Sequence, residues 1–176
     1  MTRSLRRGWI AGLLALVTAL PALAQRGDDA ERQSKNGRLE AEIGGVRVVV
    51  HYGRPEVRGR KLWGELVPYG RVWRTGADEA TTISIDRDAE VGGQRVPAGT
   101  YSLFTVPQAG AWTVILNRTA RQWGAFSYDA GQDVARFEVQ TRAGGHVEAL
   151  DFAPGEGEIL LRWERLRVPI PIRAAS

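Results

Sequence analysis

The sequence predicts an all-β fold: a single antiparallel β-sandwich of roughly nine short strands with long irregular loops. Two observations support this prediction. Apolar residues recur with a period of two in most segments after residue 38, as in strands with one buried face. Turn signals built from Gly and Pro separate these segments, and the chain has 21 glycines and 8 prolines. A closed β-barrel is the alternative, because the number of strands alone does not distinguish the two.

The N-terminus has the pattern of a secretory signal peptide. Three arginines precede an apolar run over residues 9–20, and Ala22-Leu23-Ala24 supplies an A-x-A cleavage site. The run is shorter than the ~20 residues that a membrane helix needs, so we expect no stable membrane insertion after cleavage. We therefore predict a signal peptide over residues 1–24, a disordered polar lead over 25–37, and one domain over 38–173.

Removing the signal peptide changes the charge of the protein. The whole chain has 24 Lys and Arg against 20 Asp and Glu, for a net charge of +4. The signal segment holds Arg3, Arg6 and Arg7, so the mature chain has 24 − 3 = 21 basic against 20 acidic residues. The near balance gives no reason to expect a nucleic-acid partner.

The first predicted hairpin joins residues 38–43 to residues 46–53 through Gly44-Gly45. Alternation places residues 46, 48, 50 and 52 on one face and residues 47, 49 and 51 on the other. His51 therefore lies on the more polar face.

The remaining strands are expected in order along the chain. They span residues 80–86, 90–96 with a turn at Gly92-Gly93, 100–106, 111–117, 133–141, 146–152 and 158–164. Residues 168–172 read VPIPI. Because two prolines that are two residues apart lack N–H groups on the same side, we expect this segment to be an edge strand.

Two long segments lack this alternation. Residues 117–132 (NRTARQWGAFSYDAGQ) form one, and residues 51–82 form the other. Between residues 54 and 74 the second segment has six cations against two acids, with aromatic side chains among them. Long loops on a rigid scaffold often hold functional sites, so we expect the site here.

Four blocks of sequence resemble a known family. They are YGRPEVRGRKLWGELVPYGRVWRTGADEATT, VPAGTYSLFTVP, WTVILN and QWGAFSYD. In this order and spacing they resemble a family of exported bacterial proteins named domain of unknown function 2911, over about residues 46–172. The resemblance implies an exported, β-rich single domain and assigns no activity.

The first functional hypothesis is a binding module for a small anionic or glycan ligand. Arginine binds carboxylates and phosphates through a two-pronged fork, and Trp and Tyr rings offer stacking surfaces. The ligand-binding candidates are Arg54, Arg60, Lys61, Tyr69, Trp73, Arg74 and Trp123.

The second hypothesis is an exported hydrolase or lyase in which His51 acts with Asp78 or Glu79 as a general base pair. Family members often have Asn at the position of Asp78, which counts against an essential acid there. The third hypothesis is a structural envelope protein in which these residues only stabilise the fold.

Other classes of site have little support in the sequence. The chain has two His and no Cys, without the spacing of a known metal site, so we predict no metal and no cofactor. The signal peptide predicts a periplasmic or extracellular location. The oligomeric state does not follow from the sequence.

Overall fold

A computed structural model describes residues 26–176, and in that range the protein is built from ten strands and two short 3₁₀ turns. The predicted signal peptide lies outside the described residues. The strands are β1 (Lys35–Ile43), β2 (Val46–Arg54), β3 (Thr81–Ile85), β4 (Ala89–Val91), β5 (Gln94–Val96), β6 (Gly99–Val106), β7 (Ala111–Asn117), β8 (Asp133–Gln140), β9 (Arg142–Gly155) and β10 (Glu158–Ala174). The turns are η1 (Asp29–Glu31) and η2 (Ala130–Gln132).

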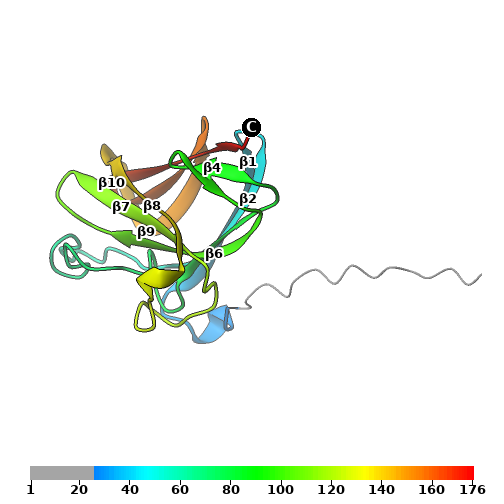
Figure 1. The fold of residues 1–176 in the computed structure, drawn as a ribbon. Coiled ribbons are helices and arrows are strands. Elements are labelled where there is room, and N and C mark those ends of the chain that lie inside the picture. The colour runs from blue at the N-terminus through cyan, green and yellow to red at the C-terminus, as the bar shows by residue number, and fades with distance from the viewer. Residues whose placement is uncertain (1–25) are drawn as a thin grey trace, which may run out of the picture.

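The strands form two antiparallel sheets, which confirms the predicted sandwich (Figure 1). The larger sheet has the order β1-β2-β3-β6-β7-β8, and the smaller has the order β5-β4-β10-β9. β1 and β2 pack against β9 and β10 across the core. In the described chain the sheets stay separate, so the alternative of a closed barrel is wrong.

The Gly-Gly turns lie where the sequence predicts them. Gly44 and Gly45 connect β1 to β2, and Gly92 and Gly93 connect β4 to β5. All four have positive φ angles, which glycine adopts without the steric penalty of a side chain. The turn chemistry therefore sets the register of both hairpins.

The core holds the alternating apolar residues between the two sheets. Val46, Val48 and Val50 of β2 are fully buried, as their common face predicts. Trp112 from β7 and Trp163 from β10 are among the largest fully buried side chains. The Trp63 ring contacts both of them, so aromatic side chains link the two sheets.

β10 corrects the expectation for VPIPI. This strand lies between β4 and β9 in the sheet order, so it is not an edge strand. Its register with β9 ends at Arg167 and its register with β4 begins at Ile172. Pro169 and Pro171 lie between the end of the pairing with β9 and the start of the pairing with β4. Their missing N–H groups therefore interrupt no backbone hydrogen-bond ladder.

The N-terminal segment also differs from the expectation of a disordered lead over 25–37. Residues 29–31 form η1, and β1 already starts at Lys35. Arg26 donates hydrogen bonds to the carbonyl oxygens of Ala77 at 2.8 Å and Glu79 at 3.2 Å. Residues 26–34 therefore form an ordered strap across the turn over residues 76–80.

A second, smaller apolar cluster lies on the outer face of the large sheet. Phe104, Ile115 and Ala80 are buried there, and the Tyr128 ring contacts Phe104 with centroids 5.2 Å apart. The segment over residues 118–129 covers this cluster. In Figure 1 it lies at the same end of the sandwich as residues 55–80.

Candidate functional site

The turn that carries Arg74 is fixed at both ends by backbone hydrogen bonds. Trp73 and Thr105 of β6 exchange two bonds, at 2.8 and 3.0 Å. Further along, the N–H of Gly124 donates to the carbonyl of Asp78 at 3.0 Å. The turn is thus held between β6 and the segment over residues 118–129.

Two residues of this turn have unusual backbone angles. Thr75 has φ 56° and Asp78 has φ 63°. Aspartate is one of the residues that tolerate this region, so Asp78 adopts its angle at little cost. A β-branched Thr does not, but Thr75 is fully buried and its carbonyl accepts a 2.8 Å bond from the Thr81 hydroxyl. Such strain persists where surrounding contacts enforce it, often at functional sites.

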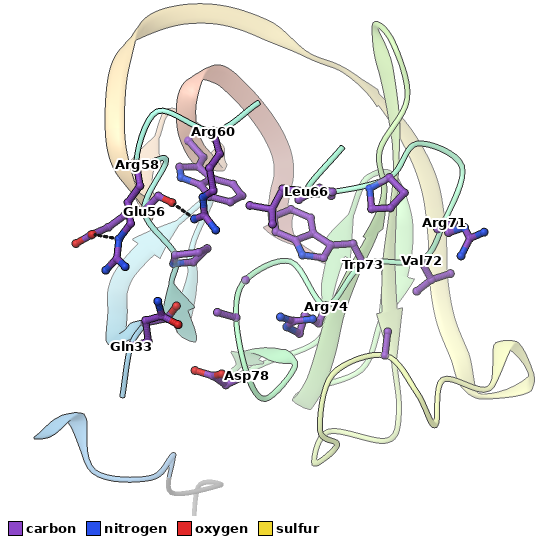
Figure 2. Close-up of a pocket in the computed structure, with 18 of the residues that line it drawn as sticks. Gln33, Glu56, Arg58, Arg60, Leu66, Arg71, Val72, Trp73, Arg74 and Asp78 are labelled. Atoms are coloured by element: carbon purple, nitrogen blue, oxygen red, sulfur yellow. Dashed lines mark hydrogen bonds and ion pairs between the residues drawn. The ribbon is translucent and has the colours of Figure 1, made fainter. Parts of the chain in front are cut away.

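Arg74 is the central side chain of the site (Figure 2). Its guanidinium is more than half buried, and its Nε is shielded from solvent without a hydrogen-bond partner. No residue in 26–176 forms an ion pair or hydrogen bond with this guanidinium. Burial lowers the pKa of Arg74 from its ordinary value, and the charge of Asp78 opposes that shift. An arginine nevertheless stays protonated at neutral pH.

Arg74 lines a cavity of about 490 Å³, within the size range of small-molecule sites. Its charged lining residues are four arginines, Arg58, Arg60, Arg71 and Arg74, and two acids, Glu56 and Asp78. The cavity is therefore positively charged on balance.

Two of these four arginines, Arg58 and Arg60, already have partners. Arg58 forms a 2.8 Å ion pair with Glu56, and Arg60 donates from Nε to the carbonyl of Val57 at 3.1 Å. Figure 2 shows the Arg71 side chain pointing away from Arg74. Arg71 is exposed, so Arg74 is the half-buried cation that an incoming anion meets without displacing a protein acceptor.

Tryptophan rings form the apolar wall of the cavity. Trp73 and Trp163 both line it and stack with ring centroids 5.9 Å apart and an angle of 16°. Trp63 contacts both rings edge-on, and Trp112 contacts Trp73 edge-on. The wall of the cavity is therefore continuous with the core.

The structure separates the predicted ligand-binding residues. Arg60, Trp73 and Arg74 line the cavity. Lys61 and Tyr69 lie around another hollow, where Lys61 pairs with the exposed Glu65. The two remaining candidates, Arg54 and Trp123, lie outside the cavity: Arg54 donates to the carbonyl of Leu150 at 3.4 Å, and Trp123 lines a different cavity.

The structure does not assemble the proposed catalytic pair. His51 has no hydrogen bond to Asp78 or Glu79 in the described residues, and burial lowers its pKa from the ordinary value. Both carboxylates instead pair with Arg32, which is 3.2 Å from Asp78 and closer to Glu79. Arg26 adds a 3.2 Å ion pair to Glu79. These carboxylates hold the strap to the turn.

Several lining residues were not predicted. Trp163 follows the alternation of a core strand, so its sequence context gave no sign of a cavity wall. Gln33 and Ser34 lie in the segment expected to be disordered. Phe126 is 86% exposed and lines the cavity. Its place in the aromatic QWGAFSYD block was the feature of the sequence that could have indicated a role at the site.

Two kinds of site are absent from residues 26–176. No group of three or more His, Cys, Asp or Glu side chains there could hold a metal ion. Within the same residues no helix is long and apolar enough to cross a membrane.

The fold and the site define a single-domain, two-sheet β-sandwich with a basic cavity between its loops. A family model described as "Protein of unknown function (DUF2911)" matches residues 34–172, so the chain belongs to this family. No curated protein and no solved structure matches the chain.

Proposed function

We propose that this chain is an exported binding protein that holds a small organic anion against Arg74. The observation that carries the proposal is the half-buried guanidinium, which faces a cavity of about 490 Å³ and has no protein acceptor in the described chain. A buried charge without a partner is unfavourable. A bound anion would supply the missing acceptor for Arg74. Because the anion binds the folded state, it would also raise the free energy of unfolding.

The cavity favours a ligand with one acidic group and an apolar body. The guanidinium fork of Arg74 matches the two oxygens of a carboxylate. Trp73 and Leu66 offer apolar surface beside it. Since Arg58 and Arg60 already have protein partners, a single carboxylate fits this site better than a polyphosphate.

Export is supported by the N-terminal sequence pattern of basic residues, apolar run and A-x-A site. On this basis the protein acts in the periplasm or outside the cell. The mature protein would bind its ligand from solution in that compartment.

The proposal is tested with acetate, benzoate, glucuronate and inorganic phosphate, by thermal shift and calorimetric titration. At least one carboxylate should raise the melting temperature of the wild type and give a measurable Kd. Arg74→Ala should weaken its binding by about tenfold or more, because a hydrogen bond to a charged group contributes roughly 1.5–3 kcal/mol. Arg74→Lys should retain only part of the affinity.

Arg71→Ala is the matched control, since Arg71 lines the same cavity but points away from Arg74 (Figure 2). It should bind the anion nearly as the wild type does. An equal loss of affinity in Arg71→Ala and Arg74→Ala would mean that the anion is attracted by the overall positive charge of the cavity and not by Arg74 in particular. If no carboxylate binds and Arg74→Ala changes stability alone, the structural hypothesis replaces this proposal.

A further inference from the structure

A row of polar residues crosses the outer face of the large sheet. Each member is the direct register partner of the next, strand by strand. The row is Arg38, His51, Thr82, Ser102, Asn117 and Asp133. Polar groups on a covered sheet face need hydrogen-bond partners.

One half of the row has its partners in the covering segment. Ser102 is fully buried, and its hydroxyl donates to the carbonyl of Thr119 at 2.7 Å. Asn117 is also fully buried and donates to the carbonyl of Asp129 and to the carboxylate of Asp133, both at 2.9 Å. This half is structurally complete.

In the other half Arg38 pairs with Glu40, whereas within the described chain His51 and Thr82 have groups without a partner. The Thr82 hydroxyl makes no side-chain hydrogen bond with residues 26–176, and the Nε2 of His51 is buried without a partner. The Oε1 of Gln122, in the covering segment, is also buried without one. Thr82 and Gln122 both line a second cavity of about 320 Å³.

An aromatic ring stands beside this second cavity. Trp123 lines it and is 60% exposed, whereas the four tryptophans at positions 63, 73, 112 and 163 pack against one another. The exposed face of the Trp123 ring offers apolar surface at the edge of this cavity. The ring face suits the C–H groups of a sugar.

The charges around the second cavity are already engaged. Arg26 and Glu79 form an ion pair at 3.2 Å, and Arg26 also donates to backbone carbonyls. The third charged lining residue, Arg121, has an interaction of its own. The cavity therefore offers hydrogen bonds and an apolar ring without an available charge.

We propose that this second cavity binds a neutral carbohydrate unit, with Trp123 as the stacking platform and Thr82 and Gln122 as hydrogen-bonding groups. Hydroxyl groups both donate and accept, so they can pair with a threonine hydroxyl and an amide oxygen alike. A volume of about 320 Å³ lies at the small end of ligand sites and suits one sugar ring.

This site is distinct from the cavity at Arg74. The turn over residues 76–80 lies between them, since Asp78 lines the first cavity and Glu79 the second. The covering segment contributes to both, with Phe126 at the first and Trp123 at the second. Sugar binding at the second cavity therefore does not depend on anion binding at Arg74.

The test uses the mature protein with glucose, galactose, N-acetylglucosamine, maltose and cellobiose, each at millimolar concentration. Saturation-transfer-difference NMR detects contact, and a titration of tryptophan fluorescence gives the Kd. At least one neutral sugar should bind the wild type. Trp123→Ala should weaken it about tenfold, and Thr82→Val should weaken it several-fold.

Phe126→Ala is the matched control, an exposed aromatic of the same segment that lines the other cavity. It should leave sugar binding unchanged. Circular dichroism checks that each variant is folded, and Trp123→Phe gives a second readout by retaining an aromatic face. Absence of binding by every sugar, equal loss in Phe126→Ala, or tighter binding of glucuronate than of glucose at this site would overturn the proposal.

Discussion

Gly53 shows how one residue shapes the candidate site. It is the last residue but one of β2, and its backbone lies against the turn that carries Arg74. A Cβ at this position would be 2.4 Å from the carbonyl oxygen of Ala77, which real Cβ atoms do not tolerate. The absence of a side chain lets the turn approach the sheet closely enough to bury Thr75.

Gly53→Ala should therefore destabilise the protein by about 1–3 kcal/mol, because the new methyl group must displace backbone rather than a flexible side chain. Urea unfolding measures the loss, and anion binding at Arg74 should weaken with it. Gly145→Ala is the control, since nothing lies within 4 Å of its Cβ position. An unchanged unfolding midpoint in Gly53→Ala would mean that the turn can move away at little cost.

The strap over residues 26–34 is the element that holds this turn from outside. The side chain of Arg26 is only 7% exposed, and its guanidinium reaches the carbonyl oxygens of Ala77, Glu79 and Ala80. Arg32 binds both Asp78 and Glu79. The strap thus satisfies backbone groups that the turn, lacking regular structure, cannot pair by itself.

Arg26→Ala should lower the free energy of unfolding by about 2–4 kcal/mol, because it leaves buried carbonyls and Glu79 without their donor. Thermal unfolding of purified mature protein is the measurement. Arg47→Ala is the control, since Arg47 is 65% exposed and pairs with Glu40 at the surface. Equal stability of the two variants would show that the strap contributes nothing to the fold.

The same element makes stability depend on pH. Burial opposes ionisation of Glu79, but the hydrogen bond from Arg32 and the charges of Arg26 and Arg32 outweigh it, so its pKa lies below the ordinary value of 4.5. A carboxyl with a lowered folded-state pKa stabilises the fold above its unfolded pKa. That contribution is lost as the pH falls through the folded-state pKa.

Glu79→Gln should therefore be clearly less stable than wild type at pH 7, and the difference should shrink as the pH falls below about 4.5 toward 3. Denaturant titrations at several pH values measure it. Glu156→Gln, at an exposed position, should match the wild type throughout. A difference that stays constant with pH would show that Glu79 acts through packing and not through charge.

At the scale of the whole molecule, local patterns predicted the strands, and distant contacts decided the site. The Gly44-Gly45 and Gly92-Gly93 hairpins follow from neighbouring residues alone, so they were predictable. Three features depend on how the sheets stack: the stacking of Trp73 on Trp163, the strap across the turn, and the separation of Trp123 from Arg74. A single sequence has no local signal for contacts of this kind.

The tryptophan cluster joins the two sheets and the cavity into one unit. Trp112 comes from the large sheet and Trp163 from the small sheet, while Trp63 and Trp73 come from the segment between β2 and β3. Trp163 is 1% exposed, and its indole donates to the carbonyl of Glu148 at 3.2 Å. Removing it takes away core packing and the cavity wall together.

Trp163→Ala should cost about 3–5 kcal/mol, as large-to-small changes of buried aromatics do. Because both sheets share the cluster, far-UV and near-UV circular dichroism should still report one coincident transition at a lower temperature. Trp123→Ala, which removes an exposed ring outside the cluster, should shift that transition little. Two separate transitions in Trp163→Ala would mean that the two sheets unfold independently. The tryptophan cluster would then not be what couples them.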